Sequence, residues 1–163
     1  MIGVKTNIVM SVEVSRRYSN DSPYFKPLYD RTARNFTLRE VSADKGYDSF
    51  SNRVHALAKG TAPYIPFRET TTGASYSQKG ELWKRMYHLY KYNAEVFNAH
   101  YHKRSNVEAT FGMIKSRFGE RLRSKTDRAQ INEALCKVLC HNICVVIQSI
   151  HELGIEPEFL SGQ

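Results

Sequence analysis

Alternating apolar positions open the chain. Between residues 2 and 12, five of the six even-numbered residues are apolar, which is the period of a strand with one buried face. A short apolar stretch at residues 37–43 runs into a polar, glycine-containing segment, and another apolar stretch covers residues 61–67. These patterns predict three strands. Asp44 is therefore expected at the carboxyl end of the second strand.

Helical spacing separates the predicted strands. Ser22 followed by Pro23 is typical of a helix start, and residues 49–59 have the length and spacing of a second helix. Strands that alternate with helices are typical of a mixed sheet flanked by helices, so the sequence predicts an α/β fold. The first of these helices is expected to bury Phe25, Leu28 and Tyr29.

The second half of the chain has a helical pattern throughout. Two apolar stripes share residues 82–90, and apolar residues dominate nearly all round residues 131–150. We expect the latter segment to be a central packing helix. Because no repeat or linker divides the chain, a single domain over residues 1–163 is expected. The stripes are Leu82, Met86 and Leu89; Trp83, Tyr87 and Tyr90; and, in a helix between them and the last one, Val107, Phe111, Ile114 and Phe118.

Charge favours a polyanionic partner. The formal net charge is +8 and the isoelectric point about 9.5, which suits phosphate neutralisation on nucleic acid better than an anionic membrane. We expect no membrane partner, since the chain lacks a run of about 18 apolar residues and a signal-peptide layout. Three cysteines, Cys136, Cys140 and Cys144, are spaced as small hydrophobic residues on one helix rather than as zinc ligands, and a reducing cytoplasm is expected.

Cations gather between residues 102 and 125, which we expect to form a helix that contacts duplex DNA through its phosphates. The alternative is an ordinary solvated helical face. Only Glu108 and Glu120 oppose these cations. The basic residues of the run are Lys103, Arg104, Lys115, Arg117, Arg121, Arg123 and Lys125.

Glu108 shares a predicted helical face with three partners. At about 100° per residue, Tyr101, Arg104 and Lys115 lie within roughly 60° of one another on the same side as Glu108, if one helix reaches back to Tyr101. A carboxylate flanked by cations and a phenol suits a metal ligand with phosphate-holding neighbours. The competing interpretation is an ordinary intrahelical pair between Arg104 and Glu108.

These residues resemble a known family. The spacing Tyr101-x2-Arg104-x3-Glu108-x6-Lys115 resembles the Y-R-E-K signature of insertion-sequence DDE transposases, and all four positions match. Residues 41–49, VSADKGYDS, resemble the segment in which that family places its second acid. Further segments resemble the family in the same order: PYIPFRET at 63–70, HKRSNVEATFGMIKSRFG at 102–119 and NEALCKVLCHNICVVIQ at 132–148.

The resemblance implies a partial ribonuclease-H-like fold with Asp44 and Glu108 as catalytic metal ligands. The implied cofactor is a pair of Mg²⁺ or Mn²⁺ ions, which suit carboxylate oxygens. The implied reaction is hydrolysis of DNA at element ends to free a 3′-hydroxyl, followed by attack of that hydroxyl on target DNA. Tyr101, Arg104 and Lys115 would hold phosphates of double-stranded transposon-end and target DNA.

One departure limits the expected activity. The family's first aspartate belongs to a strand before residues 2–12, so we expect an incomplete active site unless an upstream transposase segment supplies it. Asp21 and Asp30 follow the strand predicted over residues 2–12 and cannot replace the missing acid, and Asp21 and Asp48 suit turn or cap positions instead. The alternatives left open are a non-catalytic DNA-binding or dimerising remnant, with a homodimer as partner, and an unrelated small basic protein. A prokaryotic, nucleoid-associated cytoplasmic location is implied.

Overall fold

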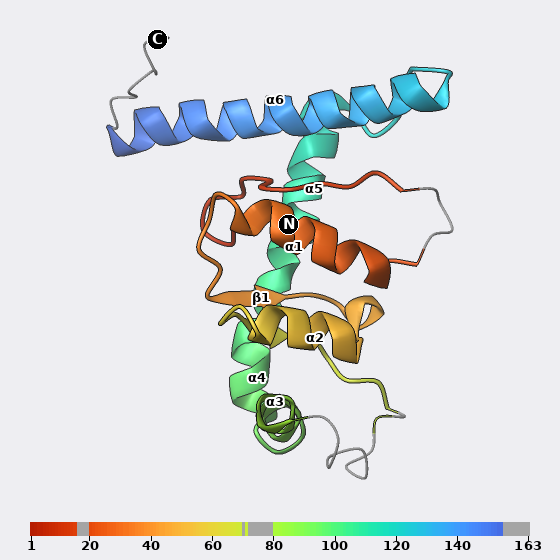
Figure 1. The fold of residues 1–163 in the computed structure, drawn as a ribbon. Helices are drawn as coiled ribbons and strands as arrows, with labels where there is room; N and C mark the ends of the chain where they lie inside the picture. Colours follow the sequence, from red (N-terminus) through yellow and green to blue (C-terminus); the bar gives the residue numbers. More distant parts are fainter. Residues whose placement is uncertain (16–19, 70, 72–79, 155–163) are drawn as a thin grey trace. The chain divides into compact units, whose positions relative to one another are not determined.

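The computed structural model describes residues 1–15, 20–69, 71 and 80–154, and Figure 1 traces the chain. The chain forms two compact units. Unit 1 comprises Met1 and Ser11–Asn106, and unit 2 comprises Ile2–Met10 together with Val107–Gln163. The expectation of one domain over residues 1–163 stays a prediction.

A parallel pair of strands lies at the centre of unit 1. Strand β1 (Glu40–Ser42) and strand β2 (Ala62–Tyr64) are joined through helix α2 (Phe50–Leu57). Their register places Glu40 opposite Ala62. The predicted strands at 37–43 and 61–67 are thus confirmed, although each is shorter than expected. In the described residues the sheet has these two strands, so the chain is a mixed α/β protein in which helices predominate.

The predicted strand over residues 2–12 is wrong. Ile2 and Val9 form a single antiparallel bridge, because the chain reverses between them. Asn7 has a positive φ of 56°, a conformation that asparagine adopts more readily than most residues. An alternation of apolar and polar residues is typical of a strand with one buried face. Here the alternation continues through the turn, so the pattern alone could not show that the chain reverses.

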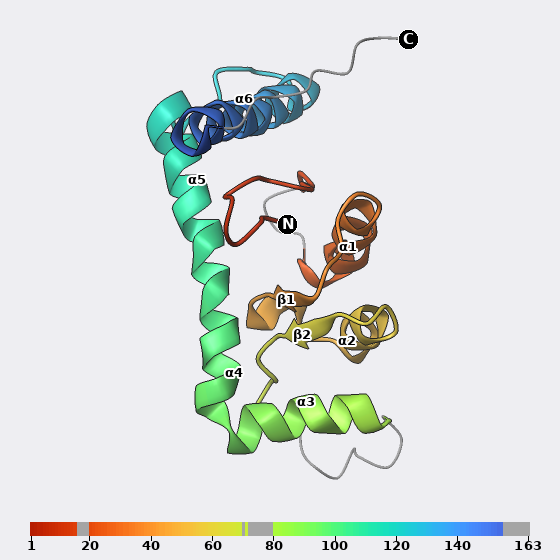
Figure 2. The same cartoon turned by 90° about the vertical axis from the view of Figure 1, so that its left-hand side faces the viewer.

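Helix α2 begins within one residue of its predicted start, whereas a 3-10 turn occupies the predicted start of α1. A 3-10 turn, Ser22–Tyr24, carries Pro23 and leads into α1 (Phe25–Ala33). Pro27 is tolerated because the first turn of a helix needs no amide hydrogen there. Helix α2 is capped by Ser49, whose side chain accepts a hydrogen bond from the Asn52 amide. In Figure 2, α1 and α2 lie on one side of the two strands and α4 on the other.

An aromatic cluster joins helices α3 (Glu81–Tyr92) and α4 (Ala94–Tyr101) to the end of β2. The predicted stripe of Trp83 and Tyr87 is buried in it, but Leu82 of the other stripe is 52% exposed. Aromatic rings stack and meet edge to face here; Phe67 contacts Trp83 with ring centroids 5.3 Å apart. The buried members of the cluster are Phe67, Trp83, Met86, Tyr87 and Phe97.

Helix α5 (Ser105–Phe118) is shorter than the predicted basic helix, and of the predicted core stripe it buries Ile114 but not Val107 or Phe111. A 3-10 turn, His102–Arg104, precedes it, and Gly119 follows it at φ 80°, where glycine ends a helix without strain. Thr110 and Ile114 are buried, while Val107 and Phe111 of the predicted core stripe are exposed. The expectation of one helix over residues 102–125 is therefore wrong.

Helix α6 (Asp127–Leu153) spans the last apolar segment. Its expected role as a central packing helix is wrong for the described residues, since His141 is its buried residue and Leu139, Ile143 and Val146 are about half exposed. By length and mean hydropathy α6 could also cross a membrane, a test that helices of other kinds pass as well. Apolar content predicts that a helix needs a partner but does not name the partner.

Candidate active site

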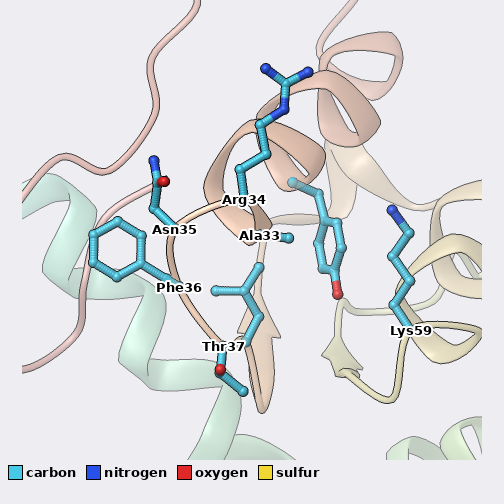
Figure 3. A pocket seen from close by; sticks show the side chains of 8 residues that line it. Ala33, Arg34, Asn35, Phe36, Thr37 and Lys59 are labelled. Carbon is cyan, nitrogen blue, oxygen red and sulfur yellow. The ribbon is translucent and has the colours of Figure 1, made fainter.

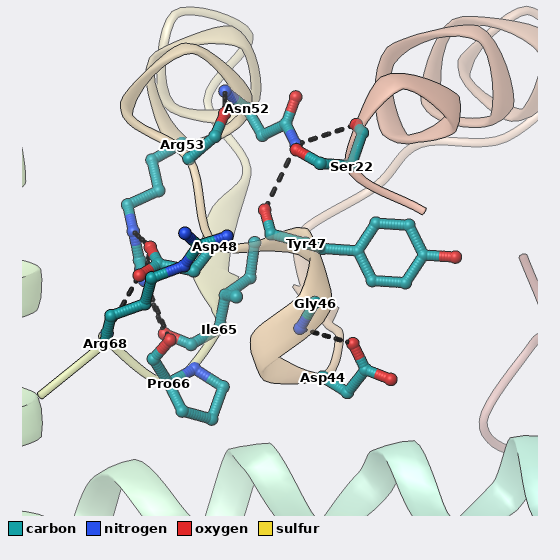
Figure 4. Close-up of polar contacts among 11 residues, drawn as sticks. Ser22, Asp44, Gly46, Tyr47, Asp48, Asn52, Arg53, Ile65, Pro66 and Arg68 are labelled. Carbon is teal, nitrogen blue, oxygen red and sulfur yellow. Dashed lines mark hydrogen bonds and ion pairs between the residues drawn. The ribbon is translucent and has the colours of Figure 1, made fainter. Parts of the chain in front are cut away.

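Asp44 lies two residues beyond β1, as predicted, at the start of a short polar loop (Figure 4). It caps the 3-10 turn Lys45–Tyr47, and its Oδ1 accepts a hydrogen bond of 2.8 Å from the Gly46 amide. The cap fixes the side chain on its own loop. The second carboxylate oxygen, Oδ2, has no hydrogen bond among the contacts described for this loop.

A buried ion pair anchors the end of this loop. The Arg53 side chain is fully buried, and one of its Nη atoms lies 2.8 Å from Asp48 Oδ1. Asp48 also accepts a hydrogen bond from the Arg68 amide, and the Arg53 guanidinium lies 3.5 Å from the Phe67 ring centroid. Burial lowers the pKa of Arg53, and the hydrogen bond with Asp48 opposes that change. Asp48 is therefore a structural partner of Arg53 rather than a mere turn residue.

Asn52 ties the same loop to the start of α1. Its side-chain amide donates to the Tyr47 carbonyl and to the Ser22 carbonyl, both at 3.1 Å. The segments that carry Asp21 and Asp44 are thereby joined through one buried side chain.

Asp21 is the acid that the sequence interpretation placed in a turn and that the structure brings beside Asp44. A Cβ atom on Gly46 would lie 3.0 Å from Asp44 Oδ1 and 3.8 Å from Asp21 Oδ2, so both carboxylates border the same small space. Asp21 precedes the first 3-10 turn but makes no side-chain cap there. Burial raises the pKa of Tyr47, and the two carboxylates add to that rise. The dipeptide Asn20–Asp21 gave no signal for this proximity.

Tyr101 and Arg104 form a pair at the carboxyl end of α4. The Arg104 Nε donates a hydrogen bond of 3.0 Å to the Tyr101 hydroxyl, and the guanidinium lies 5.5 Å from the Tyr101 ring centroid. The Tyr101 ring stacks on Phe97, at 6.0 Å between centroids. Two of the four signature residues are therefore held together in unit 1.

Glu108 and Lys115 belong to unit 2 and stand on α5. Glu108 is exposed in the first turn of the helix, where the helix dipole favours a negative charge. Lys115 pairs with Glu120 at 3.3 Å. The 3-10 turn before Ser105 breaks the single helix that the shared face assumed. That Asp44 and Glu108 meet at one cation stays a prediction.

The remaining cations occupy α5 and a loop. Arg117 is on the helix, whereas Arg121 and Arg123 lie in the segment between α5 and α6, and all three are exposed. Lys137 donates to the carbonyls of Gly119 and Arg121. These contacts fix the backbone of the loop to α6 while its arginine side chains stay in solvent.

Glu133 of α6 completes this attachment. Its carboxylate accepts the amides of Arg123 and Ser124, at 2.9 Å from Oε2 to each. These backbone hydrogen bonds lower the pKa of Glu133 to about 2, with a smaller contribution from Lys137. Sequence reasoning had assigned Glu133 no role.

The other candidate features of the described residues, which are metal-ligand side chains, cysteines and a pocket, do not form a second site. Within residues 1–15, 20–69, 71 and 80–154, no three His, Cys, Asp or Glu side chains are grouped to hold a metal, and the three cysteines are free. A pocket of about 380 Å³ in unit 1 (Figure 3) is lined by residues of α1 and the segment after it, together with Lys59. Lys59 already pairs with Asp30. The pocket contains none of the motif residues.

Comparison with known families identifies the class of protein. The family model described as the transposase DDE domain matches residues 1–143. The chain therefore belongs to the transposase DDE-domain family, whose members act on DNA and generally use divalent metal ions. Comparison with curated proteins and with solved structures found no match.

Proposed function

We propose that this chain is a catalytic portion of an insertion-sequence transposase, in which Asp44 and Glu108 bind divalent cations that serve phosphodiester hydrolysis and strand transfer. The observation that carries the proposal is the family match over residues 1–143, combined with an aspartate directly after β1 and a glutamate at the start of α5. A ribonuclease-H-like arrangement of the complete domain is part of the proposal.

The donor atoms at both positions fit Mg²⁺ or Mn²⁺. Asp44 commits one oxygen to the Gly46 amide, and Asp21 adds negative charge beside it. Glu108 is exposed, so a cation could reach it without a large desolvation cost. Hard divalent ions prefer such carboxylate oxygens.

The chain's own residues would orient the DNA. The bound ions would stabilise the attacking and leaving oxygens of an in-line displacement. Arg104, held by the Tyr101 hydroxyl, and Lys115 would bind phosphates next to the cleaved bond, which fixes the strand for attack. Arg117, Arg121 and Arg123 would hold the flanking duplex through its backbone.

Metal binding tests the two carboxylates. We expect Asp44→Asn and Glu108→Gln each to weaken Mn²⁺ binding to the full chain, measured by electron paramagnetic resonance of the free ion. Glu95→Gln is the matched control, because Glu95 is an exposed acid in the first turn of α4 outside the motif. Equal Mn²⁺ affinity in all four proteins would refute the assignment.

Cleavage separates the enzyme from a remnant. We expect residues 1–163 alone not to cut a duplex that carries the DNA flanking the coding sequence, because the motifs supply two acids and two-metal displacement needs a third. Supplying an upstream segment with an aspartate-bearing strand should restore cutting in Mg²⁺ or Mn²⁺, and Glu108→Gln should abolish it. Restored cutting that survives Glu108→Gln contradicts the roles. No cutting with any upstream segment favours the DNA-binding or dimerising alternative.

The basic residues at the end of α5 and in the segment after it are the proposed DNA interface. Replacing Arg117, Arg121 and Arg123 by Gln should weaken duplex binding and flatten the log–log salt slope by up to about 2.7, or about 0.9 for each phosphate contact. The matched control removes the same charge from α3 through Lys84, Arg85 and Lys91. Equal slopes in the two triple variants, measured by fluorescence anisotropy, would exclude this interface.

A second copy of the chain is the proposed partner of α6. Apolar side chains repeat along the helix at alternating spacings of three and four residues, the heptad period that pairs helices. No charged residue interrupts the repeat, and most of its members are exposed. Its members are Cys136, Leu139, Ile143, Val146, Ile150 and Leu153.

Light scattering tests this pairing. Leu139→Lys with Val146→Lys should convert a dimer to a monomer, because each lysine would face its counterpart across the seam. Gln148→Lys is an exposed position of α6 outside the repeat and should leave the dimer intact. A native chain that is monomeric at high concentration excludes the homodimer.

A further inference from the structure

Glu40, the first residue of β1, binds two residues of the segment that carries Tyr101 and Arg104. One carboxylate oxygen lies 2.6 Å from His100 Nδ1, and the other accepts a hydrogen bond from Lys103 Nζ. The three side chains are each about one-third exposed. Neither the family resemblance nor the motif spacing assigns Glu40 a role.

Two further contacts hold His100 from the same pair of strands. The Ser42 hydroxyl donates a hydrogen bond of 2.9 Å to the His100 carbonyl. The imidazole stacks on the Tyr64 ring, with centroids 4.3 Å apart and planes 5° from parallel. Glu40 and Ser42, at the two ends of β1, and Tyr64 of β2 therefore all contact His100 near the end of α4.

These contacts connect the Asp44 loop with the Tyr101–Arg104 pair, two parts of the proposed site that both lie in unit 1. Asp44 follows β1 after a single intervening residue. Tyr101 and Arg104 flank the gripped residues, and Arg104 is already tied to the Tyr101 hydroxyl. A strand that holds residues 100–103 thus sets where the Arg104 guanidinium stands relative to the Asp44 loop.

Ionisation of Glu40 favours this arrangement. Partial burial opposes ionisation, but hydrogen bonds from Lys103 and His100 outweigh it, so the pKa of Glu40 lies below its usual value. The carboxylate is therefore charged at neutral pH and holds both partners. A glutamine could accept one hydrogen bond but would lose the charge that attracts Lys103.

We propose that Glu40 is a positioning residue, which through His100 and Lys103 holds the Tyr101–Arg104 pair against β1 so that Arg104 can bind a DNA phosphate beside Asp44. The inference rests on the proposed function, since it assigns Arg104 to phosphate binding. Glu40 touches neither the DNA nor the metal ions in this role.

The proposal can be tested in the full chain by whether Glu40→Gln raises or lowers the affinity for duplex DNA. Glu40→Gln removes a negative charge, which by charge alone would tighten binding to duplex DNA. Positioning predicts the opposite, a loss of about tenfold, the size of one weakened charge-assisted hydrogen bond. Glu13→Gln is the matched control, because Glu13 pairs with Arg31 at 3.2 Å and is 36% exposed. It should leave affinity unchanged or slightly raised.

A double-mutant cycle shows whether Glu40 acts through Arg104. In an Arg104→Gln background, Glu40→Gln should have little further effect on DNA affinity, whereas an independent role would give additive losses. Additive losses, or a Glu40→Gln protein that binds DNA as tightly as Glu13→Gln, overturn the proposal. If Arg104→Gln itself leaves affinity unchanged, the assignment of Arg104 to phosphate binding falls as well.

Hydrogen exchange decides the geometry independently of DNA. The amides of residues 100–104 should exchange faster in Glu40→Gln and unchanged in Glu13→Gln, while Trp83 fluorescence shows that unit 1 remains folded in both. If the amides of residues 100–104 exchange at the same rate in Glu40→Gln as in the native chain, Glu40 does not position this segment. That outcome refutes the proposal even where the metal-binding variants behave as the proposed function requires.

Discussion

Unit 1 and unit 2 are each stabilised internally by a different kind of interaction. Unit 1 contains two apolar clusters, one around Phe67 and Phe97 and one around Phe25 and Tyr29. In the described residues of unit 2, the buried apolar side chains are Val9 and Ile114. Hydrophobic burial is the main stabilising contribution to most folds, so unit 1 has a core of its own and unit 2 has little of one.

Hydrogen bonds replace apolar burial in unit 2. The Asn142 side chain donates to the Val9 carbonyl at 2.9 Å and accepts from the Val9 amide at 2.8 Å. His141 Nε2 lies 3.0 Å from the Asn7 carbonyl oxygen, while its buried Nδ1 has no hydrogen-bond partner. A satisfied pair of this kind specifies a position but contributes only about 1 kcal/mol per hydrogen bond. The described residues of unit 2 are therefore held more by hydrogen bonds than by apolar burial.

Spectroscopy can follow the two units separately. Trp83 and the tyrosines among the described residues lie in unit 1, and Trp83 is buried there. Tryptophan fluorescence and near-ultraviolet tyrosine signals thus report unit 1, whereas the amide exchange of α6 reports unit 2.

The largest expected effect contrasts the two kinds of apolar residue. Phe97→Ala should lower the free energy of unfolding of unit 1 by about 3–5 kcal/mol, because a fully packed ring is lost and a cavity remains. In the monomeric chain, at concentrations too low for α6 to pair, Leu139→Ala should change stability by less than about 0.5 kcal/mol, because Leu139 is 59% exposed. Urea unfolding followed at Trp83 and by α6 exchange measures both. A Leu139→Ala cost of several kcal/mol would show that a partner covers α6 in solution.

The buried ion pair of unit 1 should produce the next effect. Asp48→Ala leaves the Arg53 charge buried without its partner and should cost about 3 kcal/mol in urea unfolding. Asp30→Ala is the matched control; its carboxylate is 43% exposed beside Lys59, and its loss should cost about 1 kcal/mol or less.

A double variant sharpens this prediction. Adding Arg53→Met to Asp48→Ala should recover much of the loss, since the orphaned charge is removed. A double variant no more stable than Asp48→Ala would mean that packing of Arg53 on Phe67, and not the charge, is what the site needs.

The smallest expected effect is the pH dependence of the contact between Glu133 of α6 and the loop at Arg123 and Ser124 in unit 2. Since the folded pKa of Glu133 is lowered to about 2 from a usual 4.5, its contribution to stability is complete above about pH 4.5 and is lost as the pH falls toward 2. Glu133→Gln should remove this dependence and loosen the amides of Arg123 and Ser124. Carbon-13 titration of the carboxyl checks the value; a midpoint near 4.5 would show that the loop is not attached to α6 in solution.

Local signals in the sequence predicted much of unit 1. Serine followed by proline predicted a helix where a 3-10 turn leads into α1, the spacing of residues 49–59 predicted α2, and the polar segment after residue 43 placed Asp44 at a strand end, because such signals depend on neighbouring residues alone. They did not reveal the turn at Asn7 or the end of α5 at Gly119. The proximity of Asp21 to Asp44 depends on contacts between segments that no local pattern records.

The candidate site divides in the same way. The spacing of Tyr101, Arg104, Glu108 and Lys115 identified the family, which the family match confirms, since a motif is a property of the sequence. Their expected common face assumed one regular helix, and a 3-10 turn interrupts it. Arg53, Glu40 and Glu133 gave no signal in the sequence, because each acts on residues brought near by folding.

The sequence by itself determined the family, the positive charge, the alternation of helices and strands between residues 22 and 64 and the positions of two metal-binding candidates, all of which depend on composition, spacing and nearest neighbours. Only the tertiary structure decided that Asp48 and Arg53 form a buried pair, that Glu40 holds the end of α4, and that α6 presents its apolar side chains to solvent. Those outcomes depend on which surfaces meet, and an amphipathic or apolar pattern states only that a surface must be covered.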